Sequence, residues 1–268
     1  MEIKKALTQL YRIGKEHLDL YMEEFNKGSY EAMKDFTAIC FYRFRSDTLS
    51  DRYIALAKQA IDKLTHTKTL SIEKVALLDS NGEKLVEEFR DITASVKKAD
   101  KGFYKTNKND EKLLRSICND FIPKLREYDY NVRNFAKRYL DKAKIKELSE
   151  EFREITCVGH KLSSVCLRDL FFFYINTYPN SGLSIESLSK EQIQCLFPVD
   201  TWIRNLCRDI FGIEGSDDEL MDNIIKICES ADVSPVYVNH GLWYRGARGQ
   251  ELLINNLANM DCLSVKEK

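Results

Sequence analysis

The chain has 268 residues, of which 44% are hydrophobic and 31% are charged, and its formal net charge is −1. This composition is typical of a folded globular protein, and it excludes both an intrinsically disordered chain and a protein whose whole surface is basic. The sequence has no run of 18 uncharged apolar residues, and it begins without the features of a secretory signal peptide. We therefore expect an intracellular protein, in the cytoplasm, nucleoid or nucleus, that does not contact a membrane.

Apolar residues recur at intervals of three and four along the whole chain, which predicts helices. The predicted helices cover residues 1–26, 29–45, 50–65, 71–79, 81–99, 111–122, 124–148, 149–156, 160–177, 189–196, 201–211, 217–230 and 235–259. Residues that commonly cap helices precede several of them, namely Ser71, Asn109 with Asp110, Asp200, and Ser216. Because no alternating strand pattern extends beyond a few residues, the predicted fold class is all-α.

Residues 97–112 carry six lysines around Phe103 and Tyr104. Lysines interleaved with aromatic rings suit a phosphate backbone, but a solvated loop between two helices explains them as well, and we favour the loop. The eight cysteines contain no C-x-x-C pair. We therefore predict reduced and mostly buried thiols, with no metal site and no cofactor.

Residues 152–175 are predicted to form the end of one helix, a short turn "TCVG" and a second helix that begins at His160 and Lys161. A helix–hairpin–helix arrangement of this kind presents backbone N–H groups to an anion such as phosphate, and Gly159 lets that anion approach the backbone closely. The helix after Lys161 is strongly apolar, so burial and the helix dipole should lower the pKa of its amine and make it a nucleophile. The alternative is an amphipathic lysine whose stem packs on the core.

The stretch "FPVDTWIRNLC", residues 197–207, places Asp200 between an apolar turn and an apolar helix. Taken alone, Asp200 is an ordinary N-cap that accepts a hydrogen bond from the first turn of that helix. Its position after Pro198 and Val199 gains meaning only beside the hairpin upstream.

The segments Val158-Gly159-His160-Lys161 and Phe197-Pro198-Val199-Asp200-Thr201 together resemble the helix–hairpin–helix DNA glycosylase superfamily, which includes endonuclease III and the 8-oxoguanine glycosylases. The resemblance is specific at these two motifs, and the all-helical composition agrees with it. Because the four-cysteine cluster loop of the endonuclease III branch is absent, the sequence is most similar to the compact archaeal 8-oxoguanine glycosylases, which lack an iron–sulfur cluster.

The resemblance implies a bifunctional DNA glycosylase and abasic-site lyase that excises an oxidised purine, with 8-oxoguanine as the first expectation, from double-stranded DNA. Lys161 would attack C1′ of the sugar, expel the base and form a Schiff base. Asp200 would stabilise the positive charge that develops on the sugar. The damaged base would flip into a cleft between two helical subdomains of a monomeric protein.

We expect one subdomain over residues 46–185, with the hairpin at 150–177, and a second built from residues 1–45 and 186–268. The expected contacts with DNA are Val158, Gly159, His160, Arg245 and Arg248. The expected residues of the base pocket are Trp202, Trp243, Tyr244 and Gln250. Core packing is the alternative for Trp243, helix capping for His160, and ordinary surface charge for the two arginines.

Three departures from the family pattern stand out. Cys157 occupies the first glycine position of the hairpin, and the interval from Lys161 to Asp200 is 39 residues, longer than is typical of the family. The excess falls within residues 178–194. The third departure is the missing cysteine cluster. The alternative function is therefore a non-catalytic helix–hairpin–helix protein that binds nucleic acid or serves as a helical scaffold.

Overall fold

The computed structural model describes residues 3–21, 27–41, 47–96 and 105–256. The side chains of residues 17, 19–21, 47–51 and 247–256 lie outside this description. The described ranges contain helices and connecting turns and no strand, so the all-α prediction is confirmed there. None of their helices is long and apolar enough to cross a membrane.

Contacts along the chain define two compact units, each described here by itself. The middle unit comprises residues 24–181, and the terminal unit comprises residues 1–23 and 182–268. The sequence placed the first boundary at residue 45 instead. The second boundary, predicted after residue 185, lies after residue 181. The first difference includes helix α3 (Ser29–Ile39), which packs on other helices of the middle unit and has seven buried residues.

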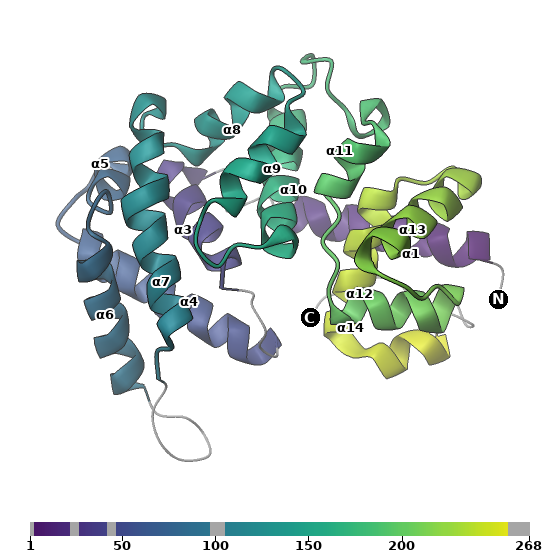
Figure 1. The fold of residues 1–268 in the computed structure, drawn as a ribbon, viewed down its shortest axis with the longest axis horizontal. Coiled ribbons are helices and arrows are strands. Elements are labelled where there is room, and N and C mark those ends of the chain that lie inside the picture. Colours follow the sequence, from purple (N-terminus) through teal and green to yellow (C-terminus); the bar gives the residue numbers. More distant parts are fainter. Residues whose placement is uncertain (1–2, 22–26, 42–46, 97–104, 257–268) are drawn as a thin grey trace. The chain divides into compact units, whose positions relative to one another are not determined.

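The middle unit is a helical cluster around α3 (Figure 1). Its other helices are α4 (Asp47–Thr65), α5 (Ser71–Ala76), α6 (Gly82–Ser95), α7 (Lys108–Ser116), α8 (Val132–Leu140), α9 (Ile145–Arg153) and α10 (His160–Thr177). A π-helical turn (Ile117–Phe121) and a 3-10 helix (Ile122–Tyr128) extend α7. Buried phenylalanines form the centre of the core, where the ring of Phe36 stacks on Phe121 with centroids 4.9 Å apart and meets Phe152 at 5.1 Å.

The single helix predicted over residues 124–148 is wrong, because the chain turns twice within it. Asp129 and Tyr130 adopt left-handed backbone conformations, with φ of 55° and 51°, just before α8 begins. Long-range contacts fix this turn, since Arg126 forms an ion pair with Asp79 (2.6 Å) and the Tyr130 hydroxyl donates to the same carboxylate (3.0 Å). The second turn, between α8 and α9, has Ala143 at φ 52°.

Two of the predicted N-caps are also wrong, and two are confirmed. Ser71 is the first residue of α5, and its hydroxyl accepts a hydrogen bond from the Tyr30 N–H (2.7 Å). Asn107, two residues earlier than predicted, caps α7. Asp200 and Ser216 cap their helices as predicted.

The terminal unit joins the first helix of the chain to the last ones (Figure 1). Its helices are α1 (Ile3–Tyr21), α11 (Lys190–Cys195), α12 (Thr201–Leu206), α13 (Asp217–Ala231) and α14 (Pro235–Asn256), with a 3-10 turn at Ile185–Ser187 and a π-helical turn at Cys207–Phe211. Helices α1 and α14 cross closely at two glycines. A Cβ on Gly14 would lie 1.9 Å from the Tyr237 carbonyl oxygen, and one on Gly241 would lie 2.1 Å from that of Leu10. Only glycine permits this approach.

Candidate functional site

The turn between α9 and α10 has a residue with a left-handed backbone conformation, and this residue is a cysteine rather than a glycine. Cys157 has φ of 72°, a left-handed conformation that costs a residue with a Cβ about 1–2 kcal/mol. Two hydrogen bonds hold the turn, from the Thr156 N–H to the Ser116 hydroxyl (2.9 Å) and from the Val158 N–H to the Ile155 carbonyl (2.9 Å). Cys157 therefore takes a backbone conformation that glycine adopts more readily.

Helix α10 begins at Gly159 without a side-chain cap. The glycine backbone is extended, with φ −92° and ψ −174°, and a Cβ placed there would meet no atom within 4 Å. The first N–H groups of a helix have no acceptor within that helix, and the dipole makes this end positive. The start of α10 therefore has open space beside its backbone, and anion binding at Gly159 and His160 stays a prediction.

Lys161 is the second residue of α10 and is half-buried. Eleven of the 18 residues of this helix are buried, which confirms that it lies in the core, and Phe172 is among them. The sequence analysis missed a buried ion pair further along the helix, between Arg168 and Asp169 (3.2 Å). Burial raises the pKa of the Asp169 carboxyl. Two charged residues inside the apolar run "VCLRDLFFF" were the signal for it.

Asp200 caps α12, and its carboxylate accepts a hydrogen bond from the Ile203 N–H (2.9 Å). The segment before it is anchored in the core of the terminal unit, where Phe197 is fully buried and Val199 is 7% exposed. Between these two anchors, the amide of Asn239 on α14 donates to the Pro198 carbonyl (3.0 Å). The carboxylate is therefore fixed through its own helix and through the extended segment that precedes it.

Asn239 was not identified from the sequence. Its side chain is completely buried, and its Oδ1 atom has no hydrogen-bond partner in the described part of the chain. Its partner lies 41 residues earlier, so no local pattern in the sequence signals the contact. The sequence shows an amide residue directly before "HGLWY", but its contact with Pro198 depends on how α14 packs.

The aromatic residues proposed for the base pocket are partly buried in the terminal unit. Trp243 and Tyr244 pack against its hydrophobic core, which favours the core-packing alternative for Trp243. The Trp243 ring also stacks on His240, with centroids 5.9 Å apart. Trp202, on α12, lies against Gly246 of α14.

The basic and amide residues of α14 are described less completely. Arg245 is half-buried, and burial lowers the pKa of its guanidinium. Arg248 and Gln250 lie within α14, but their side chains are outside the described part. Of the lysine-rich segment 97–112, residues 97–104 lie outside it too.

The predicted residues thus fall into two groups on different units. Val158, Gly159, His160 and Lys161 surround the start of α10 in the middle unit. Asp200, Trp202, Trp243, Tyr244 and Arg245 lie on α12 and α14 of the terminal unit, where these helices pack together.

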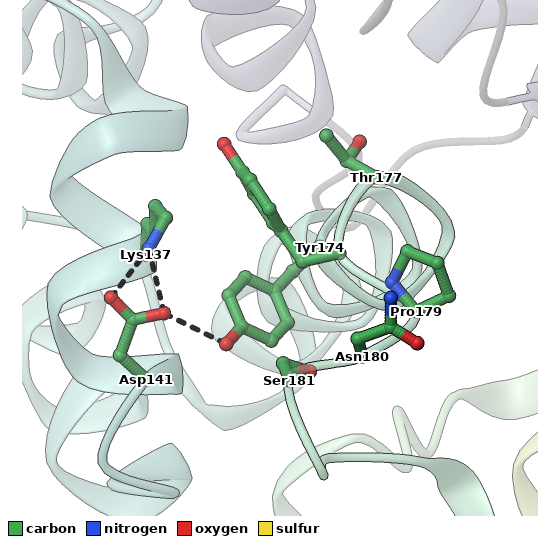
Figure 2. A pocket seen from close by; sticks show the side chains of 8 residues that line it. Lys137, Asp141, Tyr174, Thr177, Pro179, Asn180 and Ser181 are labelled. Carbon is green, nitrogen blue, oxygen red and sulfur yellow. Dashed lines mark hydrogen bonds and ion pairs between the residues drawn. The ribbon is translucent and has the colours of Figure 1, made fainter.

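A pocket of about 380 Å³ in the middle unit was not predicted (Figure 2). Lys137 of α8 and Asp141, the residue that follows this helix, form one wall and are joined by an ion pair of 2.6 Å. The Tyr174 hydroxyl donates to the same carboxylate (2.8 Å), and the Lys137 ammonium lies 4.8 Å from the centre of the Tyr178 ring. The hydrogen bond from Lys137 is the main reason that the pKa of Asp141 is lowered.

Potential metal ligands do not cluster in the described ranges, where no three His, Cys, Asp or Glu side chains are placed to hold an ion. The seven cysteines described there form no disulfide with one another, and five of them are buried. Comparison with known proteins identifies no relative, since no protein family, no curated protein and no solved structure matches this chain.

Proposed function

We propose that this protein is a DNA repair glycosylase with abasic-site lyase activity, which excises an oxidised purine, 8-oxoguanine first among them, from double-stranded DNA. The observation that supports this most is the left-handed backbone of Cys157 (φ 72°) at the first glycine position of the hairpin motif. The residue departs from the motif, but its positive φ is one that glycine adopts readily, which supports a hairpin at this position. An uncapped helix start with open space at Gly159 suits a DNA phosphate.

In the proposed reaction, the neutral Nζ of Lys161 attacks C1′ of the damaged nucleotide, and the bond from C1′ to the base breaks. The base leaves with the electron pair of that bond and gains a proton. The amine then loses a proton, and its lone pair forms a double bond to C1′ as the bond from C1′ to the ring oxygen breaks. The ring oxygen takes up a proton, and the Schiff base results. Removal of a proton from C2′ breaks the bond from C3′ to its phosphate oxygen, and the strand is cut.

Asp200 has the supporting role in this proposal. Its carboxylate would stabilise the positive charge that develops on the sugar as the base departs. Capping of α12 fixes the orientation of the carboxylate before substrate arrives, so little reorganisation is needed during the reaction.

Borohydride trapping tests the proposal directly. We expect the wild-type protein, incubated with duplex DNA that contains 8-oxoguanine or an abasic site, to form a covalent adduct that survives a denaturing gel. Mass spectrometry should locate the adduct on Lys161. Lys161→Gln should abolish it, whereas Lys146→Gln, which alters an exposed lysine of α9, should retain it.

The opposite outcome would favour the alternative. A protein that binds duplex DNA but forms no adduct with any of a panel of lesions is a non-catalytic nucleic-acid-binding protein. An adduct that persists in Lys161→Gln would assign the chemistry to another amine.

A further inference from the structure

The pocket on α8 and α10 is built entirely from the middle unit. Its walls are the second half of α8, the end of α10 and the turn that follows, with the lining residues Lys137, Asp141, Tyr174, Thr177, Tyr178, Pro179, Asn180 and Ser181. Figure 2 shows Lys137 and Asp141 on one side, Pro179 and Asn180 on the other, and the Tyr174 ring between them. A volume of about 380 Å³ is at the lower end of the range for small-ligand sites, about 300–1,000 Å³.

The walls of the pocket combine flat apolar surfaces with hydrogen-bonding groups. Tyr174 and Tyr178 contribute two aromatic rings with centroids 5.2 Å apart, and Tyr178 is 36% exposed. Asp141, Asn180 and hydroxyl groups supply donors and acceptors. Because Lys137 neutralises Asp141 within the pocket, the lining carries no net charge. Such walls suit a flat, neutral ring with polar edges.

The stretch of chain that forms one wall of the pocket is basic, unlike the protein as a whole. Residues 132–146 carry six cationic side chains and one carboxylate, in a chain whose net charge is −1. Arg133, one turn before Lys137 on α8, lies 5.2 Å from the centre of the Phe173 ring. Lys142 is exposed, and its positive charge contributes to the lowered pKa of Asp141. These cations would not strengthen the binding of a neutral sugar, the other flat-sided ligand with polar edges, whereas they would attract a phosphate.

We propose that this pocket binds one unpaired base of a single nucleic-acid strand, with the flanking phosphates near Arg133 and Lys142. Aromatic rings inside a basic surface are how proteins hold single strands without reading their sequence. The identity of the strand as DNA rests on the proposed function, but the pocket lies in the middle unit alone and needs neither Asp200 nor the terminal unit.

Photocrosslinking locates the base. A single-stranded oligonucleotide with one 5-iododeoxyuridine is irradiated with the full-length protein, and the crosslinked peptide is identified by mass spectrometry. We expect it within residues 174–181. Crosslinks confined to other segments would overturn the proposal.

Fluorescence anisotropy with a labelled single strand provides the second measurement. Tyr178→Ala should weaken binding about tenfold, because stacking on an aromatic ring contributes that much or more per base. Tyr178→Phe is the matched control, since it keeps the ring and should bind as the wild type does. Equal affinity for all three proteins, or displacement of the strand by a neutral disaccharide but not by a nucleoside, would contradict the proposal.

Failure of this inference and failure of the proposed function give different results. An adduct on Lys161 with no crosslink at residues 174–181 leaves the glycosylase proposal intact and removes the base-binding pocket. A crosslink at residues 174–181 without any borohydride adduct does the reverse.

Discussion

The starts of α10 and α12 show two ways of building the same local structure. Helix α10 begins at Gly159 with no side-chain cap and with open space in front of it. Helix α12 begins at Asp200, which caps it, after a segment anchored in the core. The first start leaves its positive end accessible to a ligand, whereas the second fixes a carboxylate. Packing therefore decides the orientation of Asp200, and access decides what the start of α10 can do.

The largest expected effect is that of Asp200→Asn, which separates the helix-capping role of Asp200 from the role that we propose for its negative charge in the reaction. Asparagine caps helices as well as aspartate does, so Asp200→Asn should leave the free energy of unfolding within about 0.5 kcal/mol of wild type. Removal of the charge should slow base release about 100- to 1,000-fold in single-turnover assays on 8-oxoguanine duplex. Asp218→Asn, an exposed acid of α13, is the control and should release the base at the wild-type rate. Full activity of Asp200→Asn would refute the assigned role.

The next effect concerns the hydrogen bond from the Asn239 amide to the Pro198 carbonyl, in the segment before Asp200. Asn239→Leu keeps the volume of the side chain but leaves the Pro198 carbonyl without its donor, so we expect a loss of about 1–2 kcal/mol of stability. Both tryptophans of the chain, Trp202 and Trp243, lie in the terminal unit, so tryptophan fluorescence during urea unfolding follows this unit. An unchanged fluorescence midpoint would mean that the Pro198 carbonyl gains nothing from the amide.

A smaller effect tests access at the start of α10. Gly159→Ala should change stability by less than about 0.5 kcal/mol, because the new Cβ meets no atom and φ is −92°. If a phosphate approaches this backbone, the methyl group should weaken duplex binding about tenfold in anisotropy measurements.

Gly212→Ala is the matched control for Gly159→Ala and should give the reverse pattern. Gly212 also has open space around it, but its φ of 66° strains any residue with a Cβ. We expect a loss of about 1 kcal/mol of stability and unchanged affinity. Equal DNA affinity for wild type and Gly159→Ala would exclude close contact at this turn.

The smallest effect concerns the hairpin cysteine. Cys157→Gly removes the strain of a left-handed residue but adds freedom to the unfolded chain, so the net gain should be below about 1 kcal/mol. Cys157→Val should lower stability by about 1–2 kcal/mol, since a β-branched residue tolerates positive φ poorly. Urea unfolding followed by circular dichroism measures both. Greater stability of Cys157→Val than of Cys157→Gly would contradict the strain argument.

Local patterns predicted the parts of the fold that local interactions determine. The bounds of α10 match the predicted 160–177, because a glycine precedes a predominantly apolar stretch there. The cap at Asp200 follows from the same kind of signal. The breaks within 124–148 were missed, because contacts with Asp79, which lies 47 residues from Arg126, hold one of the turns.

The candidate site divides in the same way. Lys161 and Asp200 stand out in the sequence because each lies within a short motif. Asn239 and the pocket at Tyr178 do not, since both arise only when helices distant in sequence pack together. The lysines of 97–112 form a recognisable charged segment in the sequence. The basic residues of 132–146 were not predicted to matter, because they are spread along a helix and a turn.

The crossing of α1 and α14 at Gly14 and Gly241 has a consequence for the order in which the protein forms. During synthesis, α1 emerges before the middle unit, but its principal partner α14 is made only after that whole unit. The middle unit is one continuous segment and can fold while the ribosome is still working. Until α14 is made, the apolar face of α1 lacks its partner helix. When the terminal unit then forms, it closes a loop of residues 24–181, and prior folding of that segment lowers the entropic cost of closing the loop.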